Sequence, residues 1–348
     1  TIAQSQKSGN VMTELAATTC IGQIQETENQ PHQAAESFQR ILQLVGEPPW
    51  PAACEAFVGL ARIYYQWNDL EAAEQYGQQG LELARQLENV DTPAACGVLL
   101  ARVKVAQGDT AGALALLEEA AQFVQTRDFG HWNGEIAAVR IHIYLQQGDL
   151  TAAAQLAELH KLPFSQARIH LAQNDPTAAF AKLEPLWQQA ETQGWADMRL
   201  QVLVLQALAY QAADKSTQAI QTAEKALALA ASGGLLRPFV DEGPPMASLL
   251  REMVKEGTAS PFAQQVLAAF GETAVSPSPA AQLLPDPLSE RELEVLKLLT
   301  TGLTGPEIAR ELMVSLNTMR THTKNIYSKL GVNSRRTAVQ RAKELNLL

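Results

Sequence analysis

The amino-acid sequence predicts an all-α protein, and three observations support this prediction. Ala, Leu, Gln and Glu dominate its 348 residues, whereas aromatic residues make up only 6%. Ala and unbranched side chains lose little rotamer freedom in a helix. A short polar turn followed by Ala-rich sequence recurs at a fixed spacing. No segment combines alternating apolar residues with a Gly-containing hairpin, the pattern typical of β-strands.

The recurring turn predicts a helical-repeat array in the first two-thirds of the chain. Asp69, Asp109 and Asp149 lie 40 residues apart, and each follows Asn or Gly and precedes an Ala-rich stretch. A fixed period of this length is typical of a helical solenoid. The interval from Asp149 to Asp175 is shortened to 26 residues. Weaker copies of the turn occur at Asn29-Gln30, Asn174-Asp175 and Asp214-Lys215.

Each turn is expected to join two helices, at 53–67 and 70–88 and then at 94–107 and 110–126. Asn or Gly suits the left-handed position that ends the first helix, and the Asp that follows caps the second. Small residues would let the paired helices approach closely, and larger apolar residues would fill the space between them. The small residues are Ala61, Ala73 and Gly80, and the larger ones are Leu60, Tyr64, Leu81 and Leu83.

The pattern over residues 10–232 resembles the tetratricopeptide repeat, because Leu60-Ala61, Tyr64, Ala73 and Gly80 occupy matching places. The period is longer than the 34 residues of that repeat. Repeat superhelices offer a long concave surface for a ligand or a partner protein. The loop-like segment 127–134 is the best single candidate for such a contact, with packing between helices as the alternative for each side chain. The candidate surface residues are Tyr65, Trp67, Phe129, His131, Trp132 and Trp195.

The repeat pattern stops at Ser232-Gly233-Gly234, so the sequence assigns a repeat domain to residues 1–232. Two shorter helical patterns follow and predict a connector at 233–270. Residues 271–287 are rich in Pro and Ser, a composition that resists regular structure and is typical of a linker. The remaining residues, 288–348, are predicted to form a separate module.

The two parts of the chain differ in charge. The net charge is −10, but residues 285–348 hold ten Lys and Arg against seven Asp and Glu, a net of +3, which leaves −13 for the remainder. Between Leu312 and Lys343 there are seven basic residues and no acidic one. A basic module on an acidic body favours binding to a polyanion. A solvated basic face is the alternative.

Helix caps divide the C-terminal module into four predicted helices. Ser289 and Thr304 each precede a Glu by three residues, which is a capping box, and Ser315 caps the third helix. The short turn 313–315 joins the second and third helices as in a helix-turn-helix. The expected helices are 290–301, 305–312, 316–330 and one from Ser334 to about 345, with the helix-turn-helix at 305–324.

The third helix has two faces. Met319, Ile326 and Leu330 share one side, with Thr323 nearby, and are expected to face the core. The opposite side carries hydrogen-bond donors, acceptors and cations without an acid, which fits the major groove of DNA. We expect Arg320, Thr321 and Lys324 to contact bases, and Lys329, Arg335 and Arg336 to lie nearer the phosphates.

The segments 288–299, 307–309, 315–322 and 325–332 together resemble the LuxR (GerE-type) DNA-binding domain, over nearly all of 288–348. The sequence departs from the common family pattern at Met319, Arg320 and Gly305-Pro306, which stand for Val, Lys and Asn-Lys. The resemblance implies that two such domains pair on DNA through the fourth helix, around Thr337, Val339, Gln340 and Lys343. The implied DNA-binding residues are Ser315, Asn317, Thr318, Arg320, Thr321, Lys324, Asn325, Lys329, Arg335 and Arg336.

The repeats, the segment Leu-Arg-Pro-Phe-Val-Asp-Glu-Gly-Pro-Pro-Met (236–246) and the LuxR-type domain, taken together, resemble the C-terminal half of the MalT-like family of large ATP-binding LuxR regulators. The resemblance implies a cytoplasmic bacterial transcription regulator that binds promoter DNA. Its further partners would be RNA polymerase and, on the repeats, a small-molecule inducer or a regulatory protein.

The MalT-like family places an ATPase domain before the repeats, but this chain contains no GxxxxGK[ST] motif. We therefore expect no cofactor in this chain, and ATP only in a preceding ATPase domain. Because the chain begins with Thr1, we favour a longer protein over a family member without that domain.

Two other classes of function are an interaction scaffold and an enzyme. An interaction scaffold built on the repeats, with DNA binding secondary, is the main alternative to a regulator. Catalysis is not expected, because the chain has no GxSxG or HExxH motif and no Cys close to a matched His. No metal site is expected either, because Cys20, Cys54 and Cys96 lie far apart. The longest apolar run, 202–210, is too short to span a bilayer.

Overall fold

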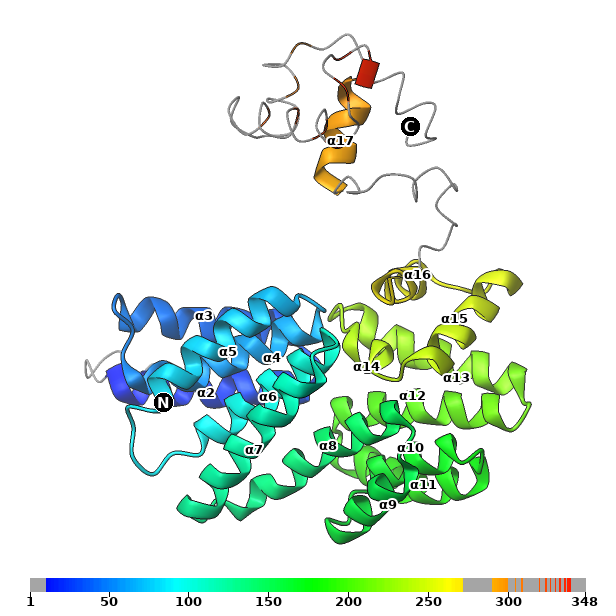
Figure 1. Ribbon diagram of the computed structural model, residues 1–348, viewed down its shortest axis with the longest axis horizontal. Coiled ribbons are helices and arrows are strands. Elements are labelled where there is room, and N and C mark those ends of the chain that lie inside the picture. The colour runs from blue at the N-terminus through cyan, green and yellow to red at the C-terminus, as the bar shows by residue number, and fades with distance from the viewer. Residues whose placement is uncertain are drawn as a thin grey trace. The chain divides into compact units, whose positions relative to one another are not determined.

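The computed structural model describes residues 11–271 and 290–299, together with single positions of the C-terminal module between 304 and 338. It divides the chain into two units, Thr1–Gly271 and Glu272–Leu348. The described residues form helices and no strand, so the all-α prediction is confirmed (Figure 1). The predicted linker at 271–287 and the caps Ser289 and Ser315 lie outside the described residues, apart from Gly271.

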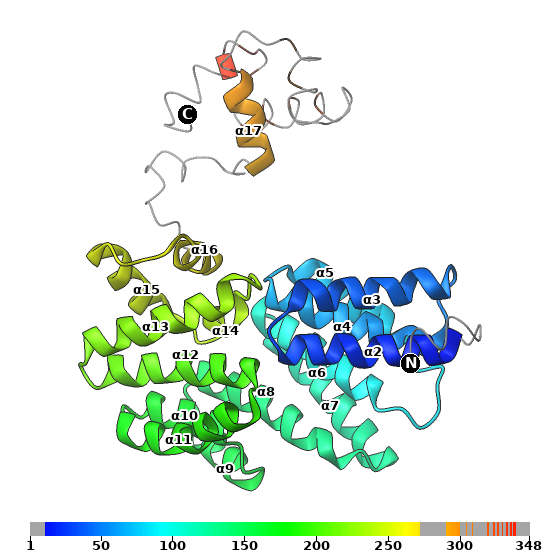
Figure 2. The same ribbon diagram turned by 180° about the vertical axis from the view of Figure 1, so that it is seen from behind.

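Helices of the first unit pack as successive antiparallel hairpins, α2 with α3, α4 with α5, and so on to α12 with α13 (Figures 1 and 2). Their bounds are α2 (Val11–Thr27), α3 (Pro31–Val45), α4 (Cys54–Gln66), α5 (Leu70–Ala84), α6 (Thr92–Ala106), α7 (Thr110–Arg127), α8 (Asn133–Gln147), α9 (Leu150–Leu159), α10 (Pro163–Ala172), α11 (Pro176–Gln193), α12 (Ala196–Ala212) and α13 (Ser216–Ala231), with short 3-10 turns η1 (Pro51–Ala53) and η2 (Gly130–Trp132).

The turns inside these hairpins have the predicted geometry. Asn68, Gly108 and Gly148 have φ angles of 62°, 81° and 76°, which end the preceding helix in the left-handed region. The Asp that follows each of them accepts a hydrogen bond from a backbone N–H three residues on, at 2.8–3.0 Å, as in Asp109 with Gly112. Of the weaker copies, the one with Asp175 makes the same bond, from the Ala178 N–H at 3.0 Å, whereas Gln30 and Lys215 make no side-chain cap bond. The predicted capping of the helices by Asp is therefore confirmed at the strong copies and at Asp175.

Helix α5 is shorter than predicted, and one hairpin of the array is shorter than the others. Helix α5 ends at Ala84 rather than at 88, because the next residues form tighter bonds such as Leu87 N–H to the Ala84 carbonyl. Helices α9 and α10 have only 10 residues each. The shortened interval between Asp149 and Asp175 is therefore one shorter hairpin rather than a break in the array.

Small residues allow the hairpins to pack closely, as predicted. Ala61 and Ala73 are fully buried, and a Cβ added at Gly80 would lie 3.1 Å from the Cβ of Phe57. Leu60 is also fully buried, whereas Tyr64, Leu81 and Leu83 are only half-buried. Tyr64 instead stacks on a ring of the neighbouring helix, with its centroid 5.2 Å from that of Tyr76. The predicted filling of the inter-helix space is confirmed in full only for Leu60.

The end of the array lies beside its beginning. After α13, residues 233–242, which we call the strap, run back to α4 and contain the short helix α14 (Arg237–Val240) (Figures 1 and 2). The backbone N–H of Leu236 donates to the Gln66 carbonyl at 2.8 Å, and Trp67 Nε1 donates to the Gly233 carbonyl at 2.8 Å. Helices α15 (Pro244–Glu256) and α16 (Pro261–Ala269) follow the strap.

The second unit is described in part. Helix α17 (Glu290–Leu299) lies where the first helix of the module was predicted, and Val295, Leu296 and Leu299 are buried on it. Met319 and Ile326 are also buried, so the core-facing side of the predicted third helix is confirmed at these two positions. Leu330 lies outside the described residues.

Candidate ligand cavity and DNA-binding module

The first helices of the hairpins surround a cavity on the inner side of the array. It has two adjoining parts, of about 350 and 480 Å³, to which α4, α6, α8, α12 and the strap all contribute. This volume is in the range of small-molecule sites. The two parts share Tyr65, Gln66, Arg102, Glu135, Gln201 and Pro238.

The parts differ in chemistry. The smaller one, the polar part, is also lined by His142, Arg168, Asp241 and Glu242. The larger one, the apolar part, has an apolar wall of Val98, Leu99, Leu200, Leu235 and Trp132, and is also lined by the charged residues Glu26, Arg62 and Asp197. A ligand that filled both would meet charged groups in each part and an apolar wall in the larger one.

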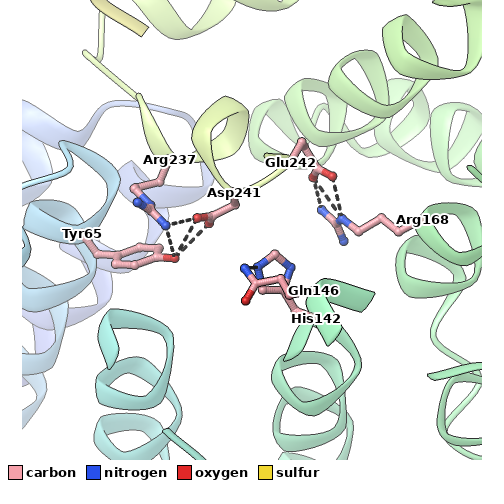
Figure 3. A network of polar contacts seen from close by, with 7 residues as sticks. All are labelled: Tyr65, His142, Gln146, Arg168, Arg237, Asp241 and Glu242. Atoms are coloured by element: carbon pink, nitrogen blue, oxygen red, sulfur yellow. Dashed lines mark hydrogen bonds and ion pairs between the residues drawn. The ribbon is translucent and has the colours of Figure 1, made fainter. Parts of the chain in front are cut away.

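Tyr65 on α4 is held by the strap (Figure 3). Its hydroxyl donates to the Asp241 carboxylate at 2.9 Å, and the Arg237 guanidinium bonds to the same carboxylate. Arg237 also lies 4.9 Å above the Tyr65 ring and donates to Asn68 Oδ1 at 3.0 Å. Burial raises the pKa of Tyr65, so the phenol stays protonated and remains a donor.

A second pair joins the strap to α10 (Figure 3). Arg168 Nη2 donates to Glu242 Oε1 at 2.6 Å, and its Nε donates to both carboxylate oxygens at 3.0 and 3.1 Å. The Glu242 side chain is only 7% exposed. Burial lowers the pKa of Arg168, but the carboxylates of Glu242 and Asp241 together raise it by more, so the guanidinium stays charged.

His142 on α8 lies near the two strap carboxylates (Figure 3). Its Nε2 is 3.0 Å from the side-chain amide of Gln146. Burial lowers the pKa of His142, with Arg168 and Arg102 acting in the same direction and the carboxylates of Asp241 and Glu242 opposing them. The imidazole is therefore neutral at pH 7.

The cavity brings together only some of the aromatic residues that the sequence singled out. Tyr65 lines both parts and Trp132 lines the apolar part. Trp67 bonds to the strap and stacks on His32, with ring centroids 5.0 Å apart. Trp195 is 36% exposed and does not line either part.

The loop-like segment 127–134 is fixed to α6. Asp91 Oδ2 lies 2.8 Å from His131 Nε2 and accepts a bond from Trp132 Nε1 at 2.9 Å. Phe129 stacks on Phe123 in the same region, with centroids 5.9 Å apart. The hydrogen bonds of Trp132 and the ring contact of Phe129 are contacts between neighbouring elements.

The charged residues of the polar part were not among the candidates from the sequence. Arg168 and His142 gave no local signal, because nothing in their own helices marks the side that faces the cavity. Asp241 and Glu242 belong to the segment 236–246, which the sequence marked as distinctive without indicating a contact. That segment was the one signal from which the site could have been found.

Two of the predicted DNA-contacting residues are described. Arg335 is half-buried, and its Nε donates to the carbonyl of Leu299, the last residue of α17, at 2.9 Å. Lys329 is also half-buried. The structure therefore gives Arg335 a packing role in addition to the predicted phosphate contact. Outside the described residues lie Ser315, Asn317, Thr318, Arg320, Thr321, Lys324, Asn325 and Arg336, as do Val339, Gln340 and Lys343 of the predicted pairing surface.

The described residues contain no group of three or more His, Cys, Asp or Glu side chains placed to hold a metal ion. None of the described helices is long and apolar enough to cross a membrane. All three cysteines are free thiols, with Cys54 and Cys96 buried and Cys20 exposed on α2. Burial raises the pKa of the Cys96 thiol to about 12.

Comparison with known proteins defines the class first. The family model of the MalT-like TPR region matches residues 1–256, and that of the bacterial regulatory proteins of the luxR family matches residues 286–342. The two matches describe a tetratricopeptide-type array joined to a luxR-type regulatory domain. The chain belongs to the family of proteins with a MalT-like TPR region.

Curated relatives agree with this family. The HTH-type transcriptional regulator MalT of Klebsiella pneumoniae (strain 342) is 29% identical over 319 residues, which are 82% of this chain and 35% of the relative. The protein of the same name from Serratia proteamaculans (strain 568) is 28% identical over 318 residues, with the same coverage. The chain therefore spans about a third of the length of these relatives.

Proposed function

We propose that the chain is the sensing and DNA-binding part of a transcription regulator. The observation that carries this proposal is the presence, in one chain, of a luxR-family match at 286–342 and a repeat array with a cavity at 1–256. The two relatives described above are both named as HTH-type transcriptional regulators. In the proposed function the cavity receives a small molecule, and the C-terminal module binds promoter DNA.

Recognition of DNA would depend on the third helix of the module. Arg320, Thr321 and Lys324 would read base edges in the major groove, and a bidentate Arg contact to guanine is the commonest of such contacts. Lys329, Arg335 and Arg336 would bind phosphates and make the affinity depend on salt. The buried Met319 and Ile326 on the opposite face support this orientation.

The remaining assignments follow from this proposal. The chain would act by binding rather than by catalysis, and two of its domains would pair on DNA. It would work in the cytoplasm, with RNA polymerase as a partner at the promoter. ATP would enter only through an ATPase domain elsewhere in a longer protein. A regulatory protein bound to the repeats is the alternative to a small-molecule signal.

Selection of DNA from a random-sequence pool tests the proposal. The purified chain should enrich one motif, and the variant Arg320→Ala/Lys324→Ala should lose selection by roughly 1–3 kcal/mol for each base contact removed. Lys225→Ala/Lys255→Ala is the matched control, because it removes two exposed cations from α13 and α15. Equal, weak binding by all three proteins with the same salt slope would contradict the proposal and favour a scaffold built on the repeats.

A further inference from the structure

The strap places two adjacent carboxylates in the polar part of the cavity. Asp241 and Glu242 both line it, although they come from outside the helical hairpins. Asp241 bonds to Arg237 of the strap itself and to the hydroxyl of Tyr65, whereas the partner of Glu242 is the guanidinium of Arg168 on α10. Glu242 thus occupies a donor of the hairpins as a bound ligand would.

The charge of the wall shows which chemistry the hairpins recognise. In the polar part the hairpins contribute the cations Arg102 and Arg168 and a single acid, Glu135, which pairs with Arg102 at 2.8 Å. Without Glu242, and with Asp241 paired to Arg237, this wall has a surplus of positive charge and an unsatisfied bidentate donor on Arg168. An Arg fork matches the geometry of carboxylates and phosphates.

We propose that Glu242 acts as an internal ligand of Arg168, and that a compact dianion, a dicarboxylate or a phosphate ester, binds the polar part in competition with it. This inference rests on the proposed function, because it names the class of signal that the cavity receives. The competition is required by charge. A dianion placed next to both strap carboxylates would meet two like charges, whereas a dianion that replaces Glu242 on Arg168 would leave only Asp241, which stays paired with Arg237 and Tyr65.

The strap is built so that only its end has to move. Phe239 is fully buried, and its ring centroid lies 6.5 Å from that of Phe262 on α16, which fixes α14 in the core. The carboxylates come after this anchor and are followed by Gly243, which has a φ of 68° and begins α15. Rotation about Gly243 would release Glu242 and shift the start of α15, on the side of the chain that continues to the DNA-binding module.

Calorimetric titration of the full chain tests the inference. The probes are succinate and glycerol 3-phosphate, with succinamide and glycerol as their uncharged counterparts, all at constant ionic strength. We expect heat of binding from at least one anion and from neither uncharged compound. The anion that binds distinguishes a carboxylate signal from a phosphate signal. Hydrogen exchange should show faster exchange of the backbone amides of residues 240–243 and 246 in the bound state.

Three variants make the test specific. Glu242→Gln removes the competing charge and keeps the shape, so the anion should bind about tenfold tighter. Arg168→Gln should abolish binding of the anion. Because this change also breaks a partly buried ion pair, Glu242→Gln serves as the test if the Arg168→Gln variant does not fold. Glu118→Gln is the control, because Glu118 pairs with Arg140 at 3.0 Å and neither residue lines the cavity. It should bind like the unaltered chain.

Two results would overturn the inference. In the first, neither anion binds to the unaltered chain or to the Glu242→Gln variant. In the second, the Glu242→Gln variant binds the anion no more tightly than the Glu118→Gln variant does. The same preparations are used for selection of DNA. A chain that selects a DNA motif but binds no anion would disprove the inference and leave the proposed function in place. A chain that binds the anion but selects no DNA motif would disprove the proposed function and leave the anion site in place.

Discussion

The Asp-capped turns of the array and the strap that closes it are stabilised in different ways. Each turn is local: Asp149 bonds to the N–H of Ala152, three residues away. The strap depends on contacts between residues far apart in sequence, such as Tyr65 and Asp241, which are separated by 176 positions. A local contact can be repeated along a chain and weakened at one copy, whereas the closure occurs once and joins the first hairpins to the last.

The largest effect is expected at the anchor of the strap. Phe239→Ala removes a fully buried ring, so we expect the free energy of unfolding to fall by about 3–5 kcal/mol in urea denaturation. Leu159→Ala is the control, since Leu159 is 73% exposed, and its effect should stay within about 0.5 kcal/mol. Similar small losses for both variants would mean that the closure contributes little to stability.

A smaller effect is expected at a single turn. Asp149→Ala removes one cap bond and should lower the free energy of unfolding by about 1 kcal/mol. Lys215→Ala lies at the equivalent position of a weak copy that makes no side-chain cap bond, so it should change stability by less than about 0.5 kcal/mol. Equal losses at the two sites would show that the cap bond does not stabilise the turn at Asp149.

The smallest effect concerns His142 beside the strap carboxylates. Its pKa is lower in the folded chain than the usual value near 6.5, so the unfolded state takes up a proton first as the pH falls. The stability that a neutral His142 gives is therefore complete above about pH 6.5 and is lost as the pH falls towards its lowered pKa. We expect His142→Gln to lose less stability than the unaltered chain between pH 7 and 5, by a fraction of the limiting ~1.4 kcal/mol per pH unit.

Urea denaturation of both proteins at several pH values measures this difference. Parallel curves for the unaltered chain and His142→Gln would contradict the assignment. A difference in stability between the two proteins that is confined to pH 5–7 would show that the closure of the array shields His142 from water.

The same contrast explains how much of the molecule could be predicted from its sequence. The turns at Asp69, Asp109 and Asp149 are determined by a few consecutive residues, so the hairpins and their caps could be predicted. Burial of Met319 and Ile326 follows from helical periodicity in the same way. These predictions needed only residues a few positions apart.

The cavity could not be predicted in this way. Its charged lining needs α6, α8, α10 and the strap to meet in space, and no pattern within a single helix carries that information. Trp67 was singled out as a candidate for ligand contact, but an aromatic side chain looks the same in sequence whether it lines a cavity or, as here, bonds to the Gly233 carbonyl. The segment 236–246 has a distinctive composition, but only the fold shows which helices it reaches.

Closure of the array also limits how the number of hairpins can change in evolution. An open solenoid can gain or lose a repeat, because each unit contacts only its neighbours. Here an inserted hairpin would carry Gly233 away from Trp67 and Leu236 away from Gln66, and both hydrogen bonds would be lost. The number of hairpins is therefore set by the need for the last to meet the first, and descendants of this protein should vary in their loops before they vary in their repeat number.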